Sequence, residues 1–237
     1  MIISIFIAAT LAVVPTQTQA VTYNEQSHYQ VREATRDGIG KFYMGREISH
    51  VMGHLGAGWL ERPKREREER TDLLLQKLSL KATDYVADLG AGTGYFSFPI
   101  ASRLTVGKVL AVDIEPKMLA LIEQRKLVDE VQNIDTVLAS EQSPNLPNAS
   151  VDVVLLVDAY HEFSYPYEVM AGVVKALRPS GRVVLVEYRG EDDNVPIKRL
   201  HKMTQQQVKR EMSAVGLKWS RTEDYLPQQH VMIFTKQ

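Results

Sequence analysis

Short apolar runs alternate with longer segments of helical periodicity along most of the chain from residue 85. Five apolar runs predict strands, at Tyr85–Leu89, Lys108–Asp113, Ile134–Leu138, Val151–Val157 and Arg182–Tyr188. Helical patterns lie between them, around Tyr95–Leu104, Pro116–Val128 and Glu168–Leu177. The fourth run has no polar residue from position 153 to 157, so both faces of that strand should be buried under helices, as in a parallel sheet. The alternation predicts an α/β fold with a doubly wound, mostly parallel sheet.

The C-terminal pattern adds a helix and two strands. Thr204 and Gln207 have the spacing of a capping box, which predicts a helix from there to Ala214. Apolar runs follow at Leu217–Arg221 and His230–Thr235. We expect these runs to close the sheet, with an antiparallel strand at that edge.

The chain before the sheet is less regular. Residues 21–60 contain six scattered glycines, each of which costs a helix about 1 kcal/mol, so we expect loops and short helices there. Glu61–Arg70 carries nine charges of alternating sign in ten residues, which is typical of a solvated helix face. The leucines between positions 73 and 80 predict that this helix continues onto the core.

The first 20 residues form a segment of their own. Residues 2–14 contain 11 apolar residues among 13, and no charged side chain occurs before Glu25. This length suits a signal peptide and is short of the ~20 residues that span a bilayer. Thr18 and Ala20 have the spacing of a cleavage site. We expect a signal peptide or a membrane tether, and hence an exported (periplasmic or secreted) or membrane-associated protein. If the segment is not a signal, the protein is cytoplasmic.

Composition narrows the function. The 237 residues carry a formal net charge of −1 and include no cysteine. A dedicated nucleic-acid binder normally has a strong basic bias, so no nucleic-acid partner is expected. Without cysteine there is no disulfide, no thiolate metal site and no cysteine nucleophile.

A glycine-rich loop follows the first predicted strand. Residues 88–94 read Asp-Leu-Gly-Ala-Gly-Thr-Gly, and a helix is expected to begin after them. Glycines let the chain turn sharply beside a ligand, and a helix N-terminus favours negative charge. A dinucleotide fingerprint needs its third glycine at position 95, where Tyr95 stands. Asp113 ends the next strand, where an acid can accept hydrogen bonds from ribose hydroxyls.

From about Thr83 to Gln237, the chain resembles the class I S-adenosylmethionine-dependent methyltransferases. The glycine loop, Ala111–Leu119, Leu146–Val154 and Leu177–Glu187 carry the resemblance, in the order and spacing of that family. It implies a Rossmann-like methyltransferase domain at 61–237, preceded by a lid-like segment at 21–60.

The resemblance also implies a site for S-adenosyl-L-methionine. The methionine end of the cofactor is assigned to Asp88 and to the loop backbone at Gly90, Ala91, Gly92 and Gly94. Asp158, with Ala159 beside it at the end of the fourth strand, is expected near the reacting methyl group.

The adenosine end is assigned to residues after the second and third strands. Asp113 is expected to bind the ribose, and Ile114 to pack on the adenine. Ser140 and Glu141 stand where the family usually has an aspartate that contacts the adenine amino group. Ser140 departs from that aspartate, and Glu141 is the substitute.

The expected activity is methyl transfer to a small-molecule acceptor. The alternatives are a protein side-chain methyltransferase and a non-catalytic S-adenosylmethionine-binding protein. His161 follows the fourth strand, where ligands bind in such sheets, and is the first candidate for a general base, with Tyr160 and Glu162 next. The alternative for His161 is to support the following helix.

No metal site is expected. His50 and His54 have a helical ligand spacing, but such pairs more often form a polar face. Asp158 with Asp193 and Asn194 resembles the magnesium ligands of catechol-type methyltransferases, but the last two lie too far past the fifth strand. Tyr43, Arg46, His50 and His54 are candidates for contacting the acceptor from the lid-like segment.

The N-terminal interpretation has a direct test. If residues 1–20 are a cleaved signal, N-terminal sequencing of natively expressed protein should begin at Val21. An intact chain recovered with membranes would instead favour a tether. Intact Met1 on a freely soluble protein would contradict both.

Overall fold

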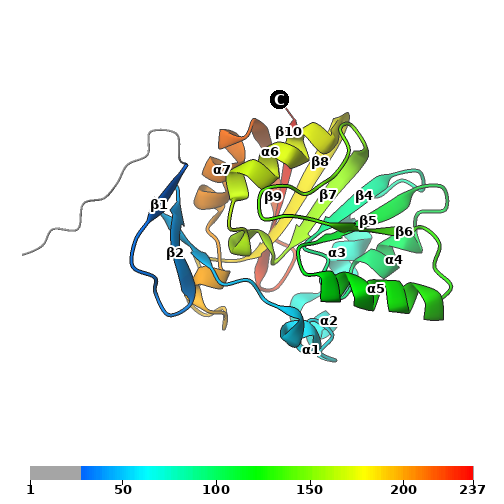
Figure 1. Cartoon of the computed structure of the whole chain (residues 1–237), viewed down its shortest axis with the longest axis horizontal. Helices are drawn as coiled ribbons and strands as arrows, with labels where there is room; N and C mark the ends of the chain where they lie inside the picture. The colour runs from blue at the N-terminus through cyan, green and yellow to red at the C-terminus, as the bar shows by residue number, and fades with distance from the viewer. Residues whose placement is uncertain (1–27, 237) are drawn as a thin grey trace, which may run out of the picture.

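The computed structural model describes residues 28–236, which form a seven-stranded sheet and a small N-terminal sheet (Figure 1). The strands of the large sheet are β4 (Tyr85–Leu89), β5 (Lys108–Asp113), β6 (Ile134–Leu138), β7 (Val151–Val157), β8 (Leu177–Tyr188), β9 (Leu217–Glu223) and β10 (Gln229–Lys236). Their order is β6-β5-β4-β7-β8-β10-β9, and β10 is the one strand that runs in the opposite direction to the other six. The doubly wound, mostly parallel sheet with a closing antiparallel strand is therefore confirmed.

Helices cover both faces of the sheet. Alternate residues of β7 belong to different cores: Val153 and Leu155 to one, Val154 and Leu156 to the other. Leucines and aromatic residues of α3 (Thr71–Lys77), α4 (Ser97–Ala101) and α5 (Pro116–Val128) fill the first core. Apolar residues of α6 (Pro166–Ala176) and α7 (Gln205–Ala214) fill the second. The unbroken apolar run of β7 is thus required by two buried faces.

Side-chain caps fix the start of two helices, and the first of them was predicted from the sequence. The Thr204 side chain accepts a hydrogen bond from the Gln207 amide at 3.2 Å, so α7 begins where its capping box predicted. The Gln207 side chain donates to Glu211 instead of returning to Thr204, so only half of the box forms. Glu115 caps α5, which has Pro116 in its first turn.

The prediction of loops and short helices for residues 21–60 is wrong over its middle part. Residues 29–49 form an antiparallel sheet of β1 (Tyr29–Val31), β2 (Gly38–Tyr43) and β3 (Arg46–Ser49). Met44 and Gly45 both have positive φ and form the two-residue turn that favours a hairpin. Short helices appear only afterwards, at η1 (His54–Gly56) and α1 (Ala57–Leu60).

The prediction of a continuous, solvated helix from Glu61 onward is also wrong. Arg70 has a φ of 56° and separates α2 (Arg65–Glu69) from α3. Arg65 and Glu69 are buried and paired with each other at 3.0 Å. The charges of this segment are therefore partly structural rather than solvated.

The N-terminal sheet packs beside η2 (Tyr160–Glu162) and η3 (Arg199–His201), at one side of the molecule (Figure 1). Arg46 makes the connection: it forms a two-pronged ion pair with Glu211 of α7, with both N···O distances at 3.0 Å. It also donates to the carbonyl of His161 at 2.9 Å. One buried guanidinium thus joins three elements that are distant in the sequence.

Among the residues that the structure describes, none of the helices is both long and apolar enough to cross a membrane. The segment expected to be a signal or tether, residues 1–20, lies outside the described residues.

The buried pair of Arg46 and Glu211 should make a large contribution to stability. Arg46→Met should lower the free energy of unfolding by about 3–5 kcal/mol, because Glu211 would keep a buried charge without a partner. The double variant Arg46→Met/Glu211→Leu should recover most of the loss in urea unfolding, since neither charge remains. Arg125→Met, which breaks an exposed pair with Asp129, should cost about 1 kcal/mol or less. A double variant as unstable as the single one would contradict this account.

Candidate active site

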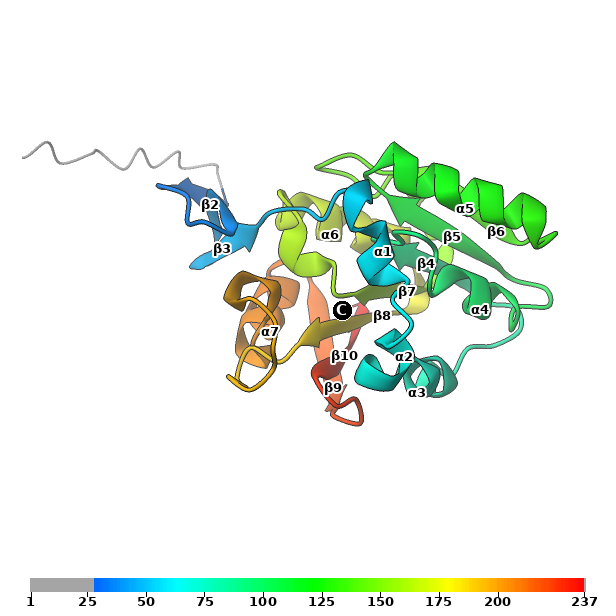
Figure 2. The same ribbon diagram turned by 90° about the horizontal axis from the view of Figure 1, so that it is seen from below.

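A cavity of about 600 Å³ opens at the carboxyl ends of the parallel strands. Its walls come from the loops after β4, β5, β6 and β7, from residues 50–69, and from the segment between β8 and η3. Helix α1 lies near β4 and β7 (Figure 2), and its Leu60 lines the cavity beside Gly92 of the glycine loop. Ligands of open α/β sheets bind at this edge, at the point where the chain adds strands on opposite sides of the first strand, here β4.

The glycine loop presents bare backbone to the cavity. The amides of Gly90 and Ala91 both donate to the Val112 carbonyl, at 2.8 and 3.0 Å, which fixes the loop against β5. A Cβ at Gly90 would lie 2.6 Å from the Ala159 side chain, and one at Gly92 would lie 2.6 Å from Leu60. Gly90 and Gly92 also have positive φ, so larger residues do not fit here.

Asp113 ties the glycine loop to the start of α5. One carboxylate oxygen accepts from the Gly92 amide and the other from the Glu115 amide, both at 2.8 Å. Burial raises the pKa of Asp113, and these backbone hydrogen bonds act in the opposite direction. Each carboxylate oxygen can accept a second hydrogen bond, so the side chain can hold the loop and a ribose together.

Asp88 lies beneath the loop instead of in the cavity wall. Its carboxylate is buried and accepts from the Ser97 hydroxyl at 2.6 Å, which links β4 to α4. Burial raises the pKa of Asp88 to about 6. Ala91 and Gly94 are likewise absent from the lining residues. These three residues position the cavity-facing Gly90 and Gly92.

The residues assigned to the adenine come together at one end of the cavity. Ile114 is partly exposed and lines the wall with Met118 of α5. Ser140 and Glu141, from the loop after β6, also line the cavity. An apolar side chain with polar groups at its edge suits a planar heterocyclic base.

Asp158 is held at the deep end of the cavity. It adopts a positive φ, and one carboxylate oxygen accepts from the Gln229 side chain at 2.9 Å. The other oxygen has no hydrogen-bond partner among the described residues, and neither has the side-chain oxygen of Gln229. Burial raises the pKa of Asp158 well above its ordinary value, and the nearby carboxylates of Glu69 and Glu187 add to this. Of the two residues only Asp158 lines the cavity, and its unused buried oxygen suits a cationic ligand group such as an ammonium.

Glu69 completes this acidic end. Its carboxylate accepts from the Tyr188 hydroxyl at 2.9 Å, from Arg65 at 3.0 Å and from Arg62. The two arginines hold the pKa of Glu69 below its ordinary value, against the effect of burial. The buried charges misassigned from the sequence therefore build part of the cavity.

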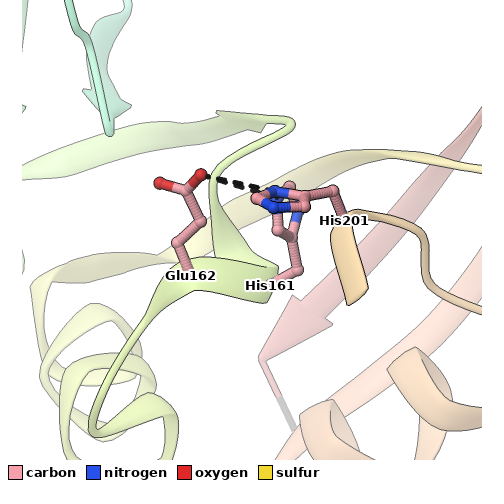
Figure 3. A group of neighbouring side chains, drawn as sticks. All are labelled: His161, Glu162 and His201. Atoms are coloured by element: carbon pink, nitrogen blue, oxygen red, sulfur yellow. Dashed lines mark hydrogen bonds and ion pairs between the residues drawn. The ribbon is translucent and has the colours of Figure 1, made fainter. Parts of the chain in front are cut away.

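Three polar side chains converge in the part of the cavity wall that follows Asp158 and Ala159 along the chain. His161 and Glu162, from η2, point toward His201 of η3 (Figure 3). His161 Nε2 lies 3.1 Å from His201 Nδ1. Glu162 Oε1 lies 3.8 Å from the first nitrogen and 3.7 Å from the second. All three residues line the cavity.

A fourth side chain fixes the orientation of His161. Glu187 lies at the end of β8 and is buried; one of its oxygens is 2.7 Å from His161 Nδ1, and the other accepts from the His161 backbone amide. Burial and the neighbouring His161 lower the pKa of His201 to about 4. Burial raises the pKa of Glu162.

The remaining candidates divide into two groups. His50 lines the cavity, whereas Tyr160 and His54 do not. Tyr160 is buried in the second core with Arg46 over its ring. His54 lies near Glu115, in a different element from His50, so the two histidines do not share a helix face. Asp193 and Asn194 are also absent from the lining residues.

Several residues in or directly behind the cavity wall could not be recognised from the sequence. Glu69 was assigned to solvent, and His201, Gln229 and Tyr188 belong to no motif. Glu187 lay within a predicted strand and ended a stretch that carried the resemblance to the family, but nothing in the sequence indicated its contact with His161, which is 26 positions away.

The cavity and loop define a cofactor-binding α/β protein whose ligand has a ribose and a cationic group. Residues 87–185 match the family model described as a methyltransferase domain. The crystal structure of a SAM-dependent methyltransferase from Aquifex aeolicus has a TM-score of 0.72 at 17% identity. It covers 78% of this chain and 98% of that one. At this identity, the likeness shows the fold.

Curated relatives point the same way. An uncharacterised methyltransferase-like protein of Schizosaccharomyces pombe is 30% identical over 151 residues, 63% of this chain and 56% of that protein. Trans-aconitate 2-methyltransferase of Escherichia coli O157:H7 is 27% identical over 116 residues, 49% of this chain and 44% of that protein. The chain thus spans about half the length of these relatives. It contains a methyltransferase domain at residues 87–185 and is similar to S-adenosylmethionine-dependent methyltransferases, which supports S-adenosylmethionine as its cofactor.

Cofactor recognition can be tested at Asp113. Asp113→Ala should weaken S-adenosylhomocysteine binding by ~1–3 kcal/mol, because the ribose hydroxyls and the amides of Gly92 and Glu115 lose an acceptor. Isothermal titration calorimetry measures the change, with the exposed Asp135→Ala as a control that should leave binding unaltered. NAD should not bind, since Tyr95 replaces the third dinucleotide glycine. Binding of NAD, or unchanged affinity in Asp113→Ala, would contradict the assignment.

Proposed function

We propose that this protein transfers the methyl group of S-adenosylmethionine to a small-molecule acceptor. The observation that carries the proposal is the composition of the cavity. The same cavity is lined by the glycine loop, by Asp113 and Asp158, and by the cluster of His161, Glu162 and His201. A volume of about 600 Å³ is in the range of small-molecule and cofactor sites, and the cofactor would fill much of it. The cofactor therefore leaves room for a small acceptor rather than for a folded protein.

The residues divide the work between binding and activation. Gly90, Gly92 and Asp113 hold the cofactor, and Asp158, oriented by the Gln229 side chain, offers an acceptor to its cationic end. When bound, the cofactor supplies a methyl group that its sulfonium already activates. The chain then has to align the acceptor for in-line displacement and remove or neutralise its proton. His161, Glu162 and His201 are the polar groups at the end where such an acceptor has space.

Cover over the cavity further favours a small acceptor. Met52 and Trp59 line it from the N-terminal side, and Ile197 and His201 line it from the segment after β8. The Met52 amide donates to Glu162 at 3.0 Å, which holds this cover against η2. The similarity to trans-aconitate 2-methyltransferase supports a small acceptor as well.

The test is a search for labelled product. The purified protein should be incubated with S-adenosylmethionine carrying a deuterated methyl group and a metabolite extract, and analysed by mass spectrometry. We expect a small molecule that gains the label with native protein and not with Asp113→Ala. Label found on proteins would favour the protein side-chain alternative. S-adenosylhomocysteine binding without labelled product from any extract would favour the non-catalytic alternative.

A further inference from the structure

The convergence of His161, Glu162 and His201 has the geometry of a metal site (Figure 3). We propose that His161 Nε2, His201 Nδ1 and Glu162 Oε1 bind a divalent transition metal, best matched by Zn²⁺, at the acceptor end of the cavity. This site differs from the two sets of residues that were rejected as metal ligands from the sequence, which were His50 with His54, and Asp158 with Asp193 and Asn194.

The distances carry the proposal. The three atoms form a triangle with sides of 3.1, 3.7 and 3.8 Å. From these sides, the point equidistant from the three atoms lies about 2.1 Å from each, which is the length of Zn–N and Zn–O bonds. The two separations from the carboxylate oxygen are too long for direct hydrogen bonds, but they suit atoms that share one ion.

The surrounding groups prepare the donors. Glu187 Oε2, 2.7 Å from His161 Nδ1, favours the tautomer that has its proton on Nδ1 and its lone pair on Nε2. Carboxylate–histidine–metal arrangements of this kind fix the ring and raise its basicity. The second oxygen of Glu162 accepts from the Met52 amide at 3.0 Å, which leaves Oε1 directed at the histidines. Both ligand residues of η2 are therefore oriented from outside the cluster.

The ligand set selects the kind of ion. Two imidazoles and one carboxylate suit zinc and other first-row transition metals, whereas magnesium and calcium prefer oxygen ligands. Three protein ligands leave a fourth position open, as in catalytic zinc sites. The three side chains line the cavity, so that position is accessible to a ligand bound there.

The role of this metal rests on the proposed methyl transfer. A cation here would bind an acceptor oxygen and lower the pKa of its hydroxyl, so that the proton leaves to solvent. The freed oxygen lone pair would form the new O–CH₃ bond while the C–S bond of the cofactor breaks, releasing S-adenosylhomocysteine. The acceptor class is thus a small hydroxyl compound with an oxygen that can bind the metal.

Metal binding can be measured apart from activity. Full-length protein freed of metal with a chelator should be titrated with zinc chloride by calorimetry. We expect one Zn²⁺ per chain. His201→Ala and Glu162→Gln should each weaken binding by more than about 100-fold, and loss of the outer partner in Glu187→Gln should weaken it by about 10–100-fold. His54→Ala, which changes a histidine outside the cavity, should leave the affinity unchanged.

A spectroscopic measurement identifies the ligands. Co²⁺ in place of Zn²⁺ should give the visible absorption of a four-coordinate nitrogen and oxygen site, and His201→Ala should abolish it. S-adenosylhomocysteine binding, measured on every variant, reports whether the fold and the cofactor site remain intact. Failure of native protein to bind zinc while it binds S-adenosylhomocysteine would overturn the metal proposal alone. Zinc affinity unaltered in His201→Ala and Glu162→Gln would also overturn it.

Discussion

The parallel pairing of β4 between β5 and β7 is the constraint on which the cavity depends. In that arrangement the carboxyl ends of three strands meet at one edge. The glycine loop, Asp113 and Asp158 follow those ends directly. The Val112 carbonyl accepts hydrogen bonds from two amides of the loop, and the Asp113 carboxylate accepts one from a third. The turn after β4 is therefore held by the strand beside it. The same hydrogen bonds therefore stabilise the sheet edge and shape the binding site.

The acceptor end depends on tertiary contacts of a different kind. Arg46 reaches from the N-terminal sheet to Glu211 and to the carbonyl of His161. Glu187 holds the same histidine from the opposite side, through its ring and its backbone amide. These contacts join segments separated by 26 to 165 positions, and each of them uses a buried charge. A short helix of three residues is positioned by its neighbours rather than by its own hydrogen bonds.

The strands and the cofactor loop were predictable because local patterns determine them. The bounds predicted for β4 through β7 agree with the structure, since buried parallel strands require unbroken apolar runs. The N-terminal hairpin was missed because its Met44–Gly45 turn lies among residues without a clear alternation. Arg65 and Glu69 were assigned to solvent because a run of alternating charges does not reveal tertiary contacts. The hydroxyl that Glu69 accepts from belongs to Tyr188, which is 119 positions away along the chain. His201 belongs to no motif, and only the folded chain brings it to His161.

The region matched by the family model ends at residue 185, before Glu187 and His201, and it begins after the segment containing Trp59. Most of the cofactor half of the cavity therefore lies within the shared domain, while much of the acceptor half comes from flanking segments. This separation gives evolution two independent parts to change. Under the proposed function, substitutions between residues 50 and 60, or between 196 and 201, would alter which compound is accepted while the glycine loop and Asp113 retain the cofactor. A shared domain can diversify in this way, because the segments that flank it in the sequence supply part of the cavity wall.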